Sequence, residues 1–249
     1  MENSNNNYKV LLVDLDDTLI MSGKVYNEAL RYASKFLSSR YDLKEEDFFN
    51  LAKEKYDVIA RNFPSVHTRH SRILLFRMAL DEVLPDSYDL GILPDIEDMY
   101  WEFFMKNVKC FPYVKSTLAK LRRNGIKIAV VSDGDLALRI RKARSSGLLK
   151  YLNEIVASEE VIFEKPFSAI FTLALSRLGV EPHQAVMLGN NYKNDVRGAQ
   201  LVDIKAGIFL PEKNANPVGQ DGTIKPDFVI KRFDEVLKIF GLDESSSSK

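Results

Sequence analysis

Three short aliphatic runs constrain the fold of this chain more than any other feature of its sequence. They are Val10–Val13, Ile128–Val131 and Ala185–Leu188. In each run the apolar residues follow one another without alternating with polar ones, which is typical of a strand buried on both faces of a parallel sheet. Segments with helical spacing separate the runs, and two further strands are expected at Lys205–Phe209 and Asp227–Ile230. This succession of strands and helices predicts an α/β fold.

The stretch 24–110 has a different pattern, because its apolar residues recur every three to four positions. Four such segments begin near Ala29, Phe48, Ile73 and Ile96. No run in this stretch has the pattern of a strand flanked by turns. We therefore expect an all-helical domain at 24–110, inserted after the first strand, and an α/β core formed by 1–23 and 111–243. The serine-rich residues 244–249 have nothing to bury and are expected to form a disordered tail.

Composition narrows the class of partner. The chain has 35 Lys and Arg against 35 Asp and Glu, so it has no basic field for a nucleic-acid backbone. It has no apolar segment of the roughly 20 residues that a membrane span needs, and its N-terminus lacks the pattern of a secretory signal. The single cysteine, Cys110, cannot form an internal disulfide. We expect a cytoplasmic protein, monomeric or homodimeric, that acts on a small molecule and on neither nucleic acid nor a membrane.

Polar residues whose side chains could take part in a reaction follow the predicted strands. Asp14 and Asp16 come after the first strand, Ser132 after the second and Asn190 after the third. Lys165 precedes a proline between the second and third strands, just before a predicted helix. Because ligands of an open parallel sheet bind beyond the carboxyl ends of its strands, we expect these side chains to gather at one edge.

This set of side chains is suited to phosphoryl transfer. Two carboxylates that are two positions apart in a strand share a face and repel, which proteins tolerate mostly where a divalent cation or proton transfer uses the pair. Mg²⁺ takes such oxygen ligands together with substrate phosphate and water. One of Asp14 and Asp16 could then attack phosphorus while the other transfers protons. Lys165 and Ser132 would meet the phosphoryl oxygens as a positive charge and a hydrogen-bond donor.

Four motifs in order resemble those of the haloacid dehalogenase (HAD) superfamily of phosphohydrolases. Val10–Leu19 is similar to the first motif, a hydrophobic strand followed by Asp-x-Asp-x-Thr. Ser132, followed by Asp-Gly, is similar to the second, and Lys165 to the third. The fourth corresponds to Gly189–Asp195. The resemblance implies a Rossmann-like parallel sheet core with an all-helical cap domain inserted after the first strand, the cap closing over the sheet to exclude water.

The resemblance also implies roles for individual residues. Asp14 would be the nucleophile that forms an aspartyl-phosphate, and Asp16 the acid that protonates the leaving group and then the base that activates water. Lys165 would hold the phosphoryl group and offset the charge of Asp14, while Thr18 would brace the loop. Asp133 is a candidate for the phosphate-binding turn, although aspartate there is also typical of a turn without a chemical role. The candidate phosphate-binding residues are Thr18, Ser132, Asp133 and Lys165.

The same resemblance implies a Mg²⁺ site made by the Asp14 carboxylate, the Asp16 backbone carbonyl and the fourth motif. Its candidate residues in the fourth motif are Asn190 and Asp195. The family's fourth motif commonly begins Gly-Asp, whereas this chain has Gly189-Asn190. An amide oxygen can bind Mg²⁺ but brings no negative charge, so we expect weaker metal affinity, with Asp195 compensating directly or through water.

Three alternatives stay open beside a Mg²⁺-dependent phosphomonoester hydrolase for a small phosphorylated metabolite. A haloacid dehalogenase uses no metal, which Asn190 would suit, but it needs no second aspartate, and Asp16 is present. A non-catalytic HAD-fold binding protein would be indicated by loss of Asp14, Ser132 or Lys165, and none is lost. A phosphomutase shares the aspartyl-phosphate and differs only in what intercepts it.

Basic residues also cluster at 67–72 in the helical stretch. They are His67, Arg69, His70 and Arg72. A charged run in a helical segment is usually a solvent-exposed face. If this cluster instead faces the sheet, it would favour substrates with a second anionic group.

Overall fold

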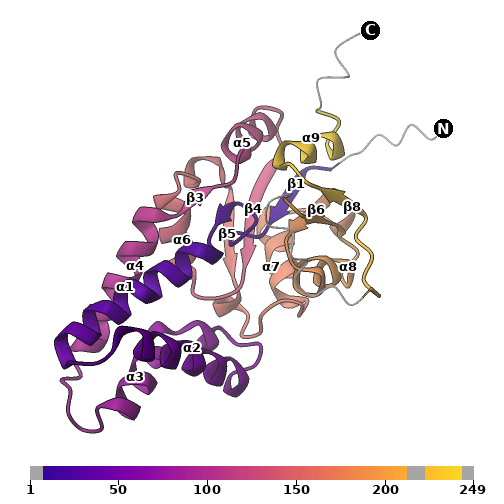
Figure 1. The fold of residues 1–249 in the computed structure, drawn as a ribbon. Coiled ribbons are helices and arrows are strands. Elements are labelled where there is room, and N and C mark those ends of the chain that lie inside the picture. The colour runs from indigo at the N-terminus through magenta and orange to yellow at the C-terminus, as the bar shows by residue number, and fades with distance from the viewer. Residues whose placement is uncertain (1–7, 212–221, 243–249) are drawn as a thin grey trace. The chain divides into compact units, whose positions relative to one another are not determined.

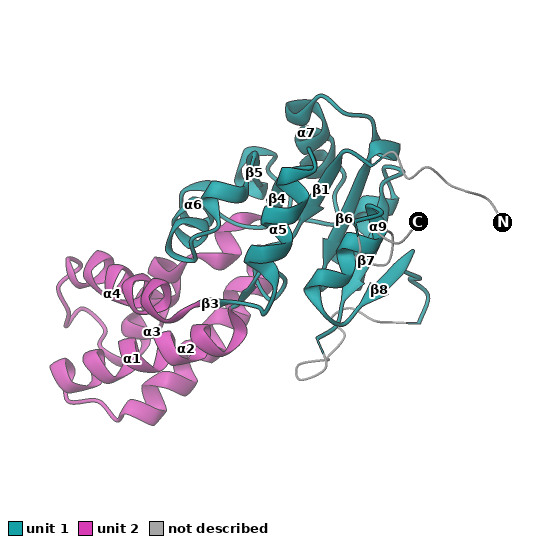
Figure 2. Cartoon of the chain, turned by 90° about the horizontal axis from the view of Figure 1, so that it is seen from above, with its two compact units in different colours: residues 1–21, 109–249 teal, residues 22–108 magenta. Residues whose placement is uncertain are grey.

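The computed structural model describes residues 8–211 and 222–242, so the predicted tail at 244–249 lies outside the described residues. The chain divides into two compact units, one of residues 1–21 and 109–249 and the other of residues 22–108 (Figure 2). None of the helices in the described part of the chain has the length and hydropathy needed to cross a membrane.

The first unit is built on a six-stranded parallel sheet in the order β5-β4-β1-β6-β7-β8 (Figure 1). Its strands are β1 Val10–Val13, β4 Lys127–Ser132, β5 Glu154–Ala157, β6 Ala185–Gly189, β7 Lys205–Phe209 and β8 Phe228–Ile230. The three aliphatic runs are the three central strands, with β1 between β4 and β6. The predicted α/β fold with a parallel sheet is therefore confirmed, and both further strands are present.

The sequence pattern did not reveal β5, which pairs with β4 at one edge of the sheet. This strand has only four residues and begins with Glu154, so its apolar stretch Ile155–Ala157 is too short to stand out. Tertiary pairing with β4, rather than local preference, explains why it is extended.

Both faces of the sheet are covered, which is why the aliphatic runs Val10–Val13, Ile128–Val131 and Ala185–Leu188 carry no polar residues. On one face, Val10 and Leu12 pack in a cluster with Ile170, Phe171 and other residues of α7. Leu11 and Val13 alternate to the opposite face and are also completely buried. The helices of this unit are α5 Val114–Arg123, α6 Leu136–Ser145, α7 Ala169–Leu178, α8 Gly198–Gln200 and α9 Val236–Ile239.

The second unit contains the four helices that the apolar spacing predicts. They are α1 Gly23–Tyr41, α2 Glu45–Asn62, α3 Arg72–Val83 and α4 Ile92–Asn107. Buried aromatic side chains of α3 and α4 form much of its core, including Phe76, Tyr100 and Phe104. The apolar residues that recur along these helices therefore pack in the core of this unit.

Arg72 corrects the interpretation of the basic cluster as a solvent-exposed face. Its side chain is buried, and its guanidinium lies 5.1–5.5 Å from the centroids of four aromatic rings, within the range of a cation–π contact. These rings belong to Tyr26, Tyr56, Tyr100 and Trp101. Its Nη1 also donates a hydrogen bond to the carbonyl of His70 at 3.0 Å. Arg72 thus belongs to the interior of the helical unit.

A short antiparallel pair lies where the chain leaves and re-enters the sheet unit. It consists of β2 Ile20–Met21 and β3 Lys109–Cys110, with Met21 opposite Lys109. We expected no strand between 24 and 110, and β3 differs from that expectation because a two-residue strand has too little pattern to detect. The pairing places the segment that leaves the sheet unit beside the segment that returns to it.

Candidate active site

Asp14 is the first residue beyond β1, and hydrogen bonds of both its backbone and its side chain fix its position. Its backbone N–H donates to the carbonyl of Leu188 in β6 at 3.0 Å, which extends the sheet pairing by one residue. Its Oδ1 accepts a hydrogen bond from Lys165 Nζ at 2.7 Å, and its Oδ2 accepts one from Thr18 Oγ1 at 3.5 Å. Asp17 lies between them with a positive φ of 55°, which turns the chain so that Thr18 faces back to Asp14.

Lys165 connects three segments of the sheet unit. Its buried ammonium donates to Asp14 Oδ1 at 2.7 Å, to Asp195 Oδ1 at 2.6 Å and to the carbonyl of Val131 in β4 at 3.1 Å. These three contacts match the three donors of an ammonium, so the direction of the side chain is determined. Burial lowers the pKa of Lys165, but the carboxylates of Asp14 and Asp195 outweigh it and hold that pKa above its ordinary value. Lys165 is therefore a fixed cation.

The surroundings of Asp14 act on its pKa in opposite directions. Burial raises the pKa of Asp14 to about 7, and the Asp195 carboxylate acts in the same direction, while Lys165 lowers that pKa. One ammonium is thus shared by two buried carboxylates. With both carboxylates ionised, the group carries one net negative charge, which a further cation could offset.

Asp195 reaches this group because β6 ends in glycine. A side chain at Gly189 would place its Cβ 2.2 Å from Asp195 Oδ2, so only glycine lets the carboxylate lie against the strand end. The same Oδ2 accepts a hydrogen bond from the backbone N–H of Asn191 at 2.9 Å. Asn191 in turn accepts from the N–H groups of Lys193 and Asn194, which opens the π-helix Tyr192–Arg197 that carries Asp195.

Ser132 and Asn190 lie at the same edge of the sheet. Ser132 is the buried last residue of β4, and Asn190 directly follows β6. Since β4 and β6 flank β1, both residues end beside the strand that leads to Asp14.

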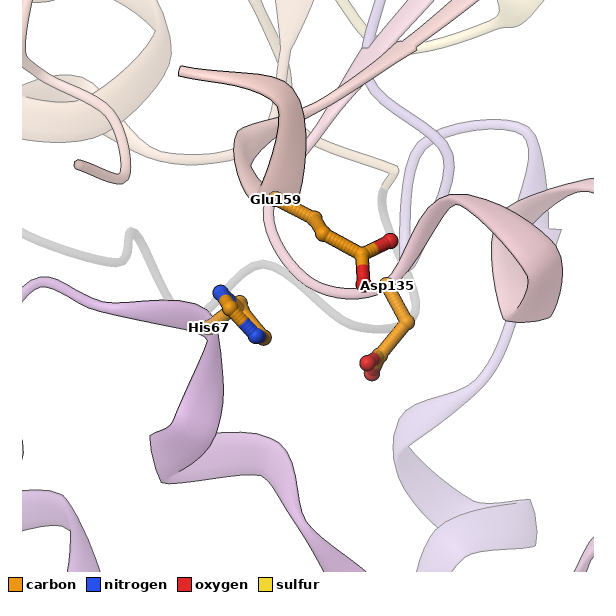
Figure 3. A group of neighbouring side chains, drawn as sticks. All are labelled: His67, Asp135 and Glu159. Atoms are coloured by element: carbon orange, nitrogen blue, oxygen red, sulfur yellow. The ribbon is translucent and has the colours of Figure 1, made fainter. Parts of the chain in front are cut away.

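Ser132 does not cap the helix that follows it, α6. The residue before α6 is Asp135, and the first N–H of the helix, on Leu136, donates to Glu159 Oε2 at 2.8 Å. Figure 3 labels the side chains of Asp135 and Glu159. Glu159 thus supplies the acceptor at this helix start.

Asp133 supports the loop that carries Lys165. Its Oδ1 accepts a hydrogen bond from the backbone N–H of Lys165 at 2.8 Å. Burial raises the pKa of Asp133 to about 6, although Lys165 lowers it. This contact connects the residue after β4 to the loop that precedes α7.

Asp16 has two partners that the sequence did not reveal. Lys142 Nζ donates to Asp16 Oδ1 at 2.9 Å and to Oδ2 at 2.7 Å, and Arg139 Nη1 donates to Oδ2 at 3.1 Å. Both cations lie on α6, where basic residues three positions apart look like part of a solvent-exposed face. Neither matched a motif, so only the fold could show that they point at Asp16.

The residues at this edge fit a divalent cation. Asp14 and Asp195 offer buried carboxylate oxygens, and with both ionised they carry, together with Lys165, one net negative charge. Asn190, whose side chain carries an amide oxygen, directly follows the neighbouring strand β6. Oxygen donors of this kind are the ligands that Mg²⁺ takes in proteins.

Known proteins resemble this chain in sequence and in fold. Residues 8–203 match the family of haloacid dehalogenase-like hydrolases. The chain is 32% identical over 239 residues to the glyceraldehyde 3-phosphate phosphatase of Methanopyrus kandleri, covering 93% of this chain and 96% of that protein. It is 30% identical over 212 residues to the ribulose-1,5-bisphosphate 5-phosphatase of Halopiger xanaduensis, covering 83% and 86%. A HAD phosphatase from Thermococcus onnurineus has a TM-score of 0.70 and 25% identity, covering 94% of this chain and 99% of that one.

Proposed function

The chain belongs to the haloacid dehalogenase-like hydrolases, and from this premise we propose that it is a Mg²⁺-dependent phosphatase of a small phosphorylated metabolite. The observation that carries the proposal is the bridge from Lys165 to both Asp14 and Asp195. It presents one buried carboxylate beside a fixed cation at the carboxyl edge of the sheet, where a phosphoryl group can meet both.

The reaction begins with attack of the Asp14 carboxylate on phosphorus. A bond forms between that oxygen and phosphorus, the bond from phosphorus to the substrate oxygen breaks, and the protonated form of Asp16 gives its proton to the leaving oxygen. Asp16, now a carboxylate, then takes a proton from water, whose oxygen attacks phosphorus while the bond from phosphorus to the Asp14 oxygen breaks. This step releases inorganic phosphate and restores the Asp14 carboxylate.

The other residues of the site hold the phosphoryl group and its surroundings. Lys165 and Ser132 would contact the phosphoryl oxygens, where charge develops as the bond to the leaving group breaks. Thr18 keeps the Asp14 carboxylate in place, and Asp133 keeps the Lys165 loop in place, through the contacts described above.

Mg²⁺ would be held by the Asp14 carboxylate, the backbone carbonyl of Asp16, the Asn190 amide oxygen and Asp195. When bound, it supplies positive charge that offsets the repulsion between the phosphate and the carboxylates.

The two relatives named above are phosphatases of small sugar phosphates, which supports a substrate of that class. We assign the choice among such substrates to a cap domain formed by the helical unit. Asp16 favours phosphate over a carbon–halogen bond, because a departing halide needs no proton whereas a departing alkoxide does.

The test is release of phosphate from 4-nitrophenyl phosphate, measured with Mg²⁺, with a chelator, and for Asp14→Asn. We expect turnover that requires Mg²⁺ and is lost in the variant, whose thermal unfolding should stay cooperative. Halide release from a 2-haloacid without phosphate release would favour the dehalogenase instead. Substantial phosphatase activity in Asp14→Asn would refute the assignment of the nucleophile.

A further inference from the structure

We infer that Arg139 and Lys142 of α6 are positioning residues that hold the Asp16 carboxylate for proton transfer. The inference rests on the proposed function, since Asp16 needs orientation only if it transfers protons. It adds two residues outside the four motifs to the machinery of the reaction.

The first support is the geometry of the contacts. Lys142 Nζ bridges both oxygens of Asp16 at 2.9 and 2.7 Å, while Arg139 Nη1 meets Oδ2 at 3.1 Å. Three hydrogen bonds to the two oxygens determine both the direction and the plane of the carboxylate. Charge-assisted contacts of this length are among the strongest that side chains make.

The second support is the burial of the cations. The Lys142 side chain is 0% exposed and that of Arg139 is 4% exposed, whereas that of Asp16 is 23% exposed. A fully buried lysine is rare because removing its charge from water is costly, and a buried ion pair is no more stabilising than well-packed apolar residues. Leu138 and Ala143, buried on the same helix, show that this helix carries apolar residues where only packing is needed. The charge of Lys142 therefore calls for a role beyond stability.

The third support is a loop shaped around Arg139. Gly134 has a φ of 110°, and a Cβ there would lie 2.1 Å from Arg139 Nη2. The Nε of Arg139 also donates to the carbonyl of Asp133 at 2.7 Å. The turn after β4 thus leaves space for the guanidinium on its way to Asp16, and it connects Asp16 to the strand end that carries Ser132.

Positioning of a general acid has a signature that depends on the leaving group. Phenolate is a poor leaving group and gains from protonation, whereas 4-nitrophenolate departs without it. The ratio kcat/KM covers only the steps up to departure of the leaving group, so it isolates the acid role of Asp16 from its later role as a base. Loss of overall packing would lower kcat/KM for both esters alike.

The experiment compares kcat/KM for phenyl phosphate and 4-nitrophenyl phosphate in wild type, Lys142→Met and Arg141→Met. Arg141 is an exposed basic residue of the same helix and serves as the matched control. We expect the decrease in kcat/KM caused by Lys142→Met to be about tenfold larger for phenyl phosphate than for 4-nitrophenyl phosphate. Arg141→Met should match wild type with both esters.

A double variant adds an independent criterion. With phenyl phosphate, Lys142→Met in an Asp16→Asn background should cost little beyond Asp16→Asn alone, because a positioning residue has nothing left to position. Arg139→Gln removes one donor and leaves Lys142, so it should shift selectivity in the same direction by less, and it carries the test if Lys142→Met does not fold.

Equal losses with the two esters, or additive losses in the double variant, would overturn the positioning role. So would an increase in kcat/KM for phenyl phosphate in Lys142→Met, which would mean that the cations hinder proton transfer by Asp16. If wild type releases neither phenol, the proposed function itself fails, and this outcome differs from turnover that is insensitive to Lys142.

Discussion

At the scale of single residues, the charge of the site depends on Lys165, which pairs with two buried carboxylates at once. Lys165→Met keeps the length of the side chain but leaves Asp14 and Asp195 facing each other. Breaking a buried pair in this way costs about 3–5 kcal/mol of stability. We expect the rate to fall by at least about 10²-fold, because the phosphoryl oxygens lose a fixed charge.

Mg²⁺ should restore part of that stability, and this can be measured by thermal unfolding with and without MgCl₂. We expect the Tm of Lys165→Met to rise more on addition of Mg²⁺ than the Tm of wild type, because a divalent cation can replace the missing charge. Lys127→Met is a suitable control, since Lys127 Nζ binds the carbonyl of Leu178 and lies on the same strand as Ser132. An equal rise in Tm for all three proteins would contradict a cation site beside Asp14.

Asn190 sets the charge of the proposed metal site. Asn190→Asp adds a carboxylate at the end of β6, so we expect the Mg²⁺ concentration for half-maximal activity to fall by at least about threefold. Asn191→Asp adds the same charge one position further on, where the side chain accepts from Lys193 and Asn194, and should have a smaller effect. An unchanged or increased Mg²⁺ requirement in Asn190→Asp would place Asn190 away from the metal.

At the scale of elements, the turn from β6 into the π-helix depends on the absence of a side chain at Gly189. Gly189→Ala forces Asp195 away from the strand end, and with it from Lys165 and the Asn191 N–H. Displacement of a site residue by about 1 Å commonly costs about 10²-fold in rate, and we expect a loss of that order in kcat/KM. Gly125→Ala, at a positive φ with nothing near its Cβ, should reduce stability and leave activity unchanged. If Gly189→Ala retains wild-type kcat/KM, the placement of Asp195 is not critical.

The elements also show where sequence reasoning succeeds. Burial on both faces makes β1, β6 and the residues 128–131 of β4 apolar, so the sequence reveals these strands and the residues that follow them. The strand β5 and the pair β2–β3 are short and depend on their partners, so no local pattern identifies them. Arg139 and Lys142 are equally hidden, because their contact with Asp16 joins residues more than 120 positions apart, at separations of 123 and 126.

The same limit applies to Arg72, which composition alone describes as one member of a basic run. Aromatic residues from α1, α2 and α4 surround it only after these helices have packed together. Charge patterning predicts exposure, and tertiary contacts with aromatic rings can reverse that prediction for a single arginine.

At the scale of the whole molecule, the helical unit is an insertion between two strands that already pair with each other. Met21 lies opposite Lys109 in the antiparallel pair β2–β3, and the compact units divide directly after Met21 and before Lys109. The ends of the insertion are therefore neighbours, so the chain can be closed there by a short turn. The six-stranded sheet has its own buried core, which includes α7.

We expect a variant in which Asn-Gly replaces residues 22–108 to fold, because a two-residue turn of this type suits an antiparallel pair. Circular dichroism should show cooperative thermal unfolding, and phosphate release from 4-nitrophenyl phosphate should persist at a reduced rate. Discrimination among sugar phosphates should be lost, since the proposed cap is gone. A second variant with a six-residue Gly-Ser linker separates failure of the turn from failure of the sheet unit. If neither variant unfolds cooperatively, the sheet unit does not fold without the helical unit, and the two cores depend on each other.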